Sequence, residues 1–171
     1  MKQKILLAIT LAIACSFITK SFSYTIWAID PKSGIANVAL EKSTAVIQTK
    51  GKTSTTSSSY TISNATSTIR IKINNAAFQS ALNSQNTLGN VNDYITLYKL
   101  SSGKTNRSFT INTDGTTNGA LIAVNFTPTE TRTYTKISPT QALIPGEYAF
   151  VDMSTKTADG NITVWTFGID N

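Results

Sequence analysis

The sequence predicts an all-β protein, a sandwich of two sheets joined by hairpin and Greek-key connections. Its composition is that of strands, because threonine, serine and asparagine are interleaved with isoleucine, valine, leucine, tyrosine and phenylalanine. Short segments of alternating polar and apolar residues also recur at intervals of about ten residues, separated by turn residues, which is typical of a sandwich. The 171 residues, 40% of them hydrophobic, suffice for one domain with one core.

The alternating segments place the expected strands in order along the chain. They lie at 24–29, 35–40, 44–49, 68–73, 94–100, 107–112, 120–126, 132–137, 147–152 and 162–167. Hairpins are expected where a glycine, which reaches the positive φ of tight loops, follows a polar residue between two such segments, at 102–103, 114–115 and 159–160.

Three segments need separate interpretation. Residues 50–59 contain no large apolar residue and are expected to form a loop. Residues 76–85 could form a short helix, because their apolar side chains fall on one helical face. The strand at 68–73 would bury its isoleucines and expose Arg70 and Lys72. These two cations form either a basic patch for an anionic partner or, as we favour, a solvated face that deters aggregation.

Residues 1–23 have the organisation of a secretory signal peptide. Lys2 and Lys4 precede an apolar run at 5–18, and small residues then lead to an expected cleavage site after Ser23. The apolar run is shorter than the ~20 residues with which a helix crosses a bilayer, so no permanent membrane segment is expected. The mature chain would be a single β-sandwich domain, 24–171, that is secreted, periplasmic or located on the outer surface.

Loss of this leader changes the charge and the redox chemistry of the chain. Lys2, Lys4 and Lys20 leave with it, which lowers the net charge from +6 to +3, and so small an excess does not predict a nucleic-acid partner. Cys15 leaves as well, so the mature chain has neither a disulfide nor a thiol. A lipoprotein is the alternative, since 11–15 resembles a lipobox in which Cys15 would carry the lipid, although the residues that follow stay apolar.

The residues that catalysis and metal binding most often need are scarce. The chain contains no histidine, which removes the commonest general base and a common zinc ligand. Glu147 and Asp152 lie on one expected strand, where about 16 Å and opposite faces separate them. Asp30 and Asp170 could meet only if the strands near the two ends of the mature chain pair. The sequence therefore predicts no enzyme, no metal site and no cofactor.

The segment 143–150 carries the most specific signal. Pro145 presets φ at the first central position of a turn, and Gly146 supplies positive φ at the second. Tyr148 follows near the start of the next strand, the position of a tyrosine corner, whose hydroxyl bonds a backbone group a few residues upstream. An ordinary turn before an edge strand is the alternative.

The pattern Leu-x-Pro-Gly-x-Tyr-x-Phe in this segment resembles the E–F connection of immunoglobulin-like domains. That resemblance implies an immunoglobulin-like Greek-key β-sandwich in which 132–137, 147–152 and 162–167 are strands E, F and G. A looser resemblance includes 94–100, Arg107, Pro139 and the ending Phe167-Gly168-Ile169-Asp170. Together with 143–150, these residues are similar to a module of uncharacterised exported bacterial proteins. This second resemblance implies export and transfers no catalytic or binding residue.

Aromatic residues offer the remaining route to a ligand. Exposed rings on strands would stack on sugar faces, whereas rings between two sheets fill the core. The rings that could stack in this way are Trp27, Tyr60, Tyr134 and Trp165, with Tyr98 as a further aromatic on a strand.

The sequence as a whole predicts a non-catalytic surface interaction or structural module. Its partner is left open between a protein and a polysaccharide at the cell surface. A carbohydrate-binding module is one alternative. A further alternative is a subunit of a surface fibre completed by a strand from a neighbour, for which 161–169 could serve as the lent strand.

Overall fold

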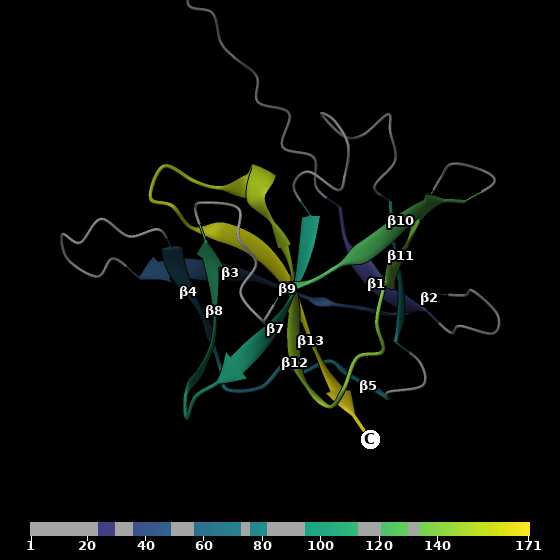
Figure 1. The fold of residues 1–171 in the computed structure, drawn as a ribbon, viewed down its shortest axis with the longest axis horizontal. Helices are drawn as coiled ribbons and strands as arrows, with labels where there is room; N and C mark the ends of the chain where they lie inside the picture. Colours follow the sequence, from purple (N-terminus) through teal and green to yellow (C-terminus); the bar gives the residue numbers. More distant parts are fainter. Residues whose placement is uncertain are drawn as a thin grey trace, which may run out of the picture.

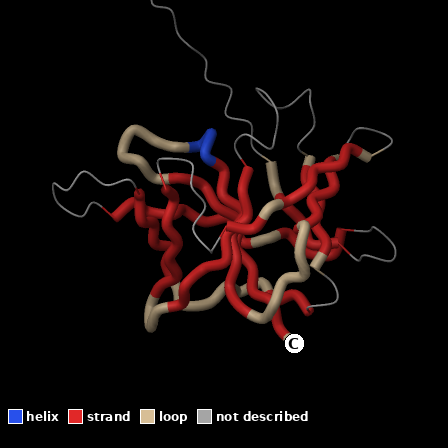
Figure 2. Tube along the Cα trace, viewed as in Figure 1, coloured by secondary structure: helices blue, strands red, loops and turns tan. Residues whose placement is uncertain are grey.

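The computed structural model of the protein describes residues 24–29, 36–48, 57–72, 76–81, 95–112, 121–129 and 134–171. Within these ranges the chain is all-β, as predicted, with one short 3₁₀ helix, η3 (Met153–Thr155), and no α-helix. Figures 1 and 2 show its strands gathered into sheets around a common centre. None of the described helical structure has the length and apolarity needed to cross a bilayer.

One sheet has five antiparallel strands in the order β10-β11-β6-β1-β2. Side chains alternate across it, so that Ile26, Phe78 and Ile137 are fully buried on one face. Its strands are β1 (Ile26–Ile29), β2 (Ala36–Ala39), β6 (Ala77–Ser80), β10 (Val124–Pro128) and β11 (Thr135–Pro139).

The second sheet closes on itself like a barrel, and we call it the closed sheet. Neighbours follow the order β7, β12, β13, β3, β4 and β8 and return to β7, while β5 and β9 pair with β13 and β7. The strands are β3 (Glu41–Gln48), β4 (Ser57–Ser63), β5 (Arg70–Lys72), β7 (Ile95–Ser102), β8 (Asn106–Asn112), β9 (Leu121–Ile122), β12 (Gly146–Asp152) and β13 (Ile162–Asp170).

Closure depends on two long strands that change partners along their length. The first part of β3 pairs with β13 and its last three residues pair with β4. In the same way β7 pairs with β12 at first and with β8 at Ser101 and Ser102. Each strand thus belongs to two sides of the ring.

The central strands β12 and β13 are covered on both faces. Side chains on one face, such as Tyr148 and Phe150, pack against the five-stranded sheet. Those on the other face, such as Ala149 and Val151, pack inside the closed sheet. Burial on both faces explains why these strands read as nearly continuous apolar runs. Figure 1 shows the five-stranded sheet on one side, β7, β12 and β13 in the middle, and β3, β4 and β8 on the other side.

The helix considered for 76–85 is wrong, because Ala77–Ser80 forms strand β6. Phe78 points into the core, where its ring centroid lies 5.1 Å from that of Phe150 and 4.8 Å from that of Phe167. The backbone of β6 pairs with β1 on one side and with β11 on the other. Sheet pairing and core contacts together outweigh the helix propensity of alanine. Residues 82–85 lie outside the described residues.

Two further segments differ from expectation. Residues 57–59 of the expected loop belong to β4, and 49–56 lie outside the described residues. The expected strand at 120–126 is interrupted at Ala123, where the chain leaves β9 on the closed sheet and enters β10 of the five-stranded sheet. Alternation along the sequence does not reveal such a change of sheet.

Two of the expected hairpins are confirmed. Between β7 and β8 the amide of Gly103 donates to the carbonyl of Asn106 at 2.7 Å. Strands β12 and β13 pair along their length, and Gly160 in their connection has φ 83°. The third hairpin is wrong: its turn lies outside the described residues, and the flanking strands β8 and β9 each pair with β7 rather than with each other.

Candidate functional site

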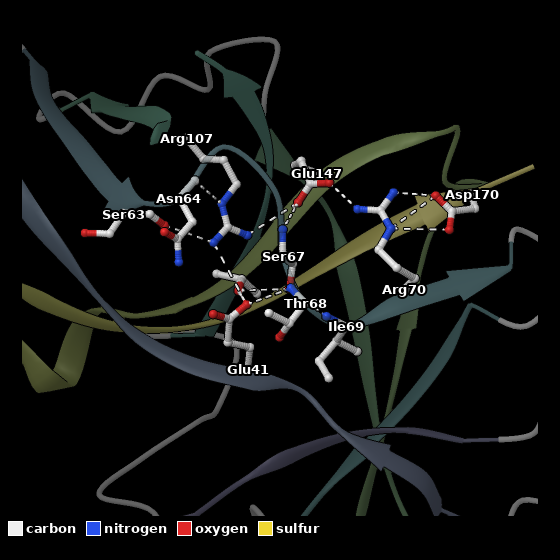
Figure 3. Close-up of polar contacts among 11 residues, drawn as sticks. Glu41, Ser63, Asn64, Ser67, Thr68, Ile69, Arg70, Arg107, Glu147 and Asp170 are labelled. Atoms are coloured by element: carbon white, nitrogen blue, oxygen red, sulfur yellow. Dashed lines mark hydrogen bonds and ion pairs between the residues drawn. The ribbon is translucent and has the colours of Figure 1, made fainter. Parts of the chain in front are cut away.

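Charged side chains from distant parts of the chain meet at one end of the closed sheet (Figure 3). Glu41 begins β3, Arg107 and Glu147 lie near the starts of β8 and β12, and Asp170 ends β13. Because most neighbouring strands are antiparallel, these ends coincide, and β5 adds Arg70 beside β13. We call Glu41, Arg70, Arg107, Glu147 and Asp170 the ion network.

Arg107 lies at the centre of the ion network and is 0% exposed. Its Nε donates to the carbonyl of Asn64 at 3.1 Å and its Nη2 donates to the carbonyl of Ser63 at 3.3 Å. Its Nη1 lies 3.4 Å from Oε2 of Glu147, and its Nη2 lies 4.0 Å from Oε2 of Glu41. A buried guanidinium needs such partners, because an unpaired charge taken out of water costs several kcal/mol.

Glu147 is 5% exposed, and both of its carboxylate oxygens accept hydrogen bonds. Oε2 accepts from the backbone amide of Ser67 at 2.8 Å and from Arg107. Oε1 accepts from Nη1 of Arg70. Two guanidinium groups therefore neutralise this carboxylate from two sides.

Ser67 connects Glu147 with the second glutamate of the network. Its amide donates to Glu147, and its hydroxyl donates to Oε2 of Glu41 at 2.8 Å. Burial alone raises the pKa of Glu41, but hydrogen bonds from Ser67, Thr68 and Thr166 and the nearby charge of Arg107 outweigh it, so the pKa lies below its ordinary value. Glu41 is thus held as a carboxylate.

Arg70 joins the network to the end of the chain. Its Nε donates to both carboxylate oxygens of Asp170, at 3.1 and 3.3 Å, and its Nη2 also contacts that carboxylate. The hydrogen bond with Asp170 raises the pKa of Arg70, and the same bond lowers the pKa of Asp170. Arg70 is 36% exposed, in agreement with the exposed position expected from the sequence, but it is engaged in ion pairs rather than merely solvated.

The turn before β12 positions Glu147 and Tyr148 on opposite faces. Gly146 has φ 151°, in agreement with the positive φ expected there. The hydroxyl of Tyr148 donates to the carbonyl of Ile144, four residues upstream, at 2.6 Å. Burial raises the pKa of this phenol, while the bond to Ile144 acts in the opposite direction.

As expected from the sequence, Glu147 and Asp152 lie towards opposite ends of β12 and do not form a carboxylate pair. Asp152, at the far end of β12 from Glu147, accepts a hydrogen bond from the hydroxyl of Tyr24 at 2.6 Å and caps η3 through the amide of Ser154 at 2.8 Å. Asp30 lies outside the described residues. Strands β1 and β13 belong to different sheets, so the strands near the ends of the expected mature chain are not paired.

The charged groups of the ion network are paired with one another and stabilise the fold. Both oxygens of Glu147 are occupied, and Arg107 has no exposed surface on which a substrate could lie. In the described part of the chain, no three carboxylates come together in a set that could hold a metal ion. The network ties β3, β5, β8, β12 and β13 at one end of the closed sheet.

The structure divides the expected stacking aromatics into two groups. Tyr60 and Trp165 are each 1% exposed within the core, and Tyr98 is buried as well, so these rings have no free face for a sugar. Trp27 is half-buried and Tyr134 is 39% exposed. Their centroids lie 6.5 Å apart in an edge-to-face contact, so the chain brings these two predicted rings together.

Sequence reasoning did not find the ion network. Glu41 and Glu147 were not paired with each other, because 106 positions separate them and no local pattern links them. Arg107 was noticed only within a resemblance, without a role. A usable signal did exist: Arg107 lies two residues before Phe109, on the same face of an alternating segment, and an arginine on an apolar face calls for a buried carboxylate partner.

The fold and its network define a class: an all-β protein in which a five-stranded sheet covers one face of a closed, barrel-like sheet, with a buried arginine between two glutamates. No protein-family model, no curated protein and no solved structure matches the chain.

Proposed function

We propose that the protein is an exported, non-catalytic β-sandwich module that acts through its surface as an interaction or structural component of a bacterial envelope. The observation that carries this proposal is the engagement of the ion network by residues of the same chain. Arg107 and Glu147 bind each other and nearby backbone groups. These buried, paired charges stabilise the fold. Interaction with partners is then a property of the exposed surface.

The strand order supports an immunoglobulin-like framework. Such domains place strands A, B, E and D on one sheet and C, F and G on the other. In this proposal β1, β6, β11 and β10 are A, B, E and D, and the five-stranded sheet has them as neighbours in that order. Strands β7, β12 and β13 are C, F and G, and β12 pairs with both of the others.

The same assignment gives a role to the remaining strands. Strands β2 to β5 then form an insertion between A and B, and β8 and β9 form one between C and D. Strands β3, β4 and β8 cover the face of β12 and β13 that a simple sandwich would leave open. The bond from Tyr148 to the carbonyl of Ile144, between E and F, supports the tyrosine corner of this framework.

Export forms the second part of the proposal and rests on the sequence of residues 1–23. Cell fractionation of the native protein, with a mass spectrum of its N-terminus, tests it. A mature chain starting at Tyr24 in the periplasm, the medium or the surface fraction is expected. A lipid-modified start at Cys15 would favour the lipoprotein alternative, and an unprocessed chain in the cytoplasm would overturn export.

The absence of catalysis is tested separately, by incubating the purified mature protein with a broad panel of hydrolase substrates. No turnover above a heat-denatured control is expected. Turnover that Glu147→Gln abolishes, with the fold retained, would assign the ion network to catalysis and overturn the proposal.

The fibre alternative has less support from the arrangement of strands. Strand β13, which would be lent to a neighbour, lies between β12 and β3 and carries the buried residues Trp165 and Phe167. Releasing it would expose both rings and break the bonds of Arg70 with Asp170. The carbohydrate alternative has a specific observation in its favour, the Trp27–Tyr134 contact.

A further inference from the structure

The described strands leave the outer face of the five-stranded sheet uncovered, as they do the outside of the closed sheet along β3. Both faces of β12 and β13 are packed, and the inner face of the five-stranded sheet packs on one of them. Figure 1 shows β1, β2, β10 and β11 on the side of the molecule opposite β3, β4 and β8, with no further sheet drawn beyond them. Among the described strands nothing covers this outer face, so a surface ligand can lie along it.

The registers between strands give the composition of that face. Trp27 lies opposite Gln79, Gln79 lies opposite Lys136, and Lys136 lies opposite Thr127. Directly paired residues project to the same side of a sheet, so these side chains form one row across β1, β6, β11 and β10. Phe78 and Ile137, next to this row in sequence, point to the core. Three strand spacings give the row a length of about 14 Å.

Trp27 and Tyr134 form the aromatic part of this surface. The ring planes meet at 88°, so that one ring supports the edge of the other and fixes its orientation. Tyr134 is 39% exposed, and Trp27 is half-buried. The five strands of the sheet contain no Asp or Glu and a single cation, Lys136.

We propose that this row is a polysaccharide-binding platform, with Trp27 as the stacking ring and with Gln79, Lys136 and Thr127 as hydrogen-bonding groups. A pyranose ring has an apolar face of C–H groups and a rim of hydroxyls. The indole matches the apolar face, while the amide, ammonium and threonine hydroxyl can bond the rim. This inference rests on the proposed function and names the ligand class of its surface.

The composition of the face favours a glycan over other macromolecules. The core of a protein interface is more apolar and richer in aromatic residues than a row with one indole among polar side chains. A nucleic acid would require several cations, whereas the strands of this sheet carry only Lys136. In a polysaccharide each sugar unit has an apolar face and a polar rim, and these match the indole of Trp27 and its polar neighbours.

A binding assay on defined polymers tests the proposal. The full mature protein is mixed with microcrystalline cellulose, chitin or insoluble xylan, and the bound fraction is measured against polymer concentration. Retention on at least one polymer is expected, with Trp27→Ala weakening it by about tenfold or more, as for a central aromatic contact. Trp27→Phe, which keeps a ring, should restore part of the affinity. Lys136→Met should cause a smaller loss.

Matched controls separate specific stacking from adsorption. Ile144 is 56% exposed but lies in the turn before β12, outside the strands of the five-stranded sheet, so Ile144→Ala should leave retention unchanged. Lys104→Met is the corresponding control for charge. The near-ultraviolet circular dichroism of buried Trp165 reports whether each variant remains folded.

Two outcomes would overturn the proposal. One is that the folded wild-type protein binds none of the three polymers, and the other is that Trp27→Ala binds as strongly as the wild type. Neither outcome touches the proposed function, which fails instead if the protein remains in the cytoplasm or turns over a substrate.

Discussion

Gly168 lies directly beneath the guanidinium of Arg70. A β-carbon at position 168 would come within 1.7 Å of Nη1 of Arg70 and within 2.1 Å of its Cζ, far inside van der Waals contact. Glycine is therefore required at position 168, because the side chain of Arg70 passes through the space that a β-carbon would fill on its way to Glu147. Asp170, two residues further along the same strand, accepts hydrogen bonds from the other edge of that guanidinium.

This relationship predicts that Gly168→Ala destabilises the protein by about 1–2 kcal/mol, because Arg70 must move and Glu147 loses one hydrogen-bond donor. Urea unfolding of Gly168→Ala, Arg70→Met and the double variant measures the effect. The two changes should be strongly non-additive, since both remove the same ion pairs. Additive effects would mean that the glycine acts independently of Arg70. Gly103→Ala, in the exposed β7–β8 hairpin, serves as the control and should not couple to Arg70.

Arg107→Met should be far more costly, by about 3–5 kcal/mol, because it leaves Glu147 buried without its inner cation. The midpoint of urea unfolding measures this loss. Replacing Arg107 and Glu147 together by Met and Leu should recover much of it, since an apolar pair leaves no unpaired charge. Lys104→Met, at an exposed site, controls for loss of one positive charge. A loss of less than about 1 kcal/mol for Arg107→Met would contradict the central role of this arginine.

Acid should weaken the fold through Glu41 and Asp170. Both have a lower pKa in the folded state than their ordinary values of 4.5 and 3.8. A depressed pKa contributes stability that is fully present above the unfolded value and is lost as the pH falls through the folded value. The free energy of unfolding should therefore decline as the pH drops below 4.5. Unfolding curves across this range test it, and Glu41→Gln should flatten the decline.

Tyr148→Phe should cost about 1 kcal/mol, because it removes the hydrogen bond to the carbonyl of Ile144 while the ring remains packed. The measurement is the urea midpoint, with Tyr134→Phe as a control on an exposed phenol. Equal stability of Tyr148→Phe and the wild type would show that the hydroxyl is dispensable. In that case the Pro145-Gly146 turn alone would hold the entry to β12.

Some features of the fold could be read from local sequence, because their causes are local. Alternating residues placed β7, β8, β12 and β13 within a few positions, and the turns at Gly103 and Gly160 need the conformations of glycine. The partner of the Tyr148 hydroxyl lies four residues upstream, within reach of a local argument. Strands β4 and β6 were not predicted, since serine-rich and alanine-rich segments become strands only when neighbours supply hydrogen bonds and a core.

The contacts of the candidate site could not be predicted from local sequence. Arg70 and Lys72 look alike in the sequence, yet only Arg70 meets carboxylates, because β5 lies parallel to the end of β13. Likewise Trp27 and Trp165 both sit on strands, but one lies on an outer face and the other at the centre of the core. Alternation says that a strand has two faces, without saying what covers each of them.

Local residue patterns were enough to predict that this protein is made of strands, where most of them run and where the chain turns, since these follow from steric and hydrogen-bonding preferences over a few residues. Local patterns could not predict that the second sheet closes, that Glu41, Arg107 and Glu147 meet, or that Trp27 and Tyr134 share an outer face. Those outcomes depend on which strands pair, and pairing is set by the burial and hydrogen bonding of the whole chain rather than by any one segment.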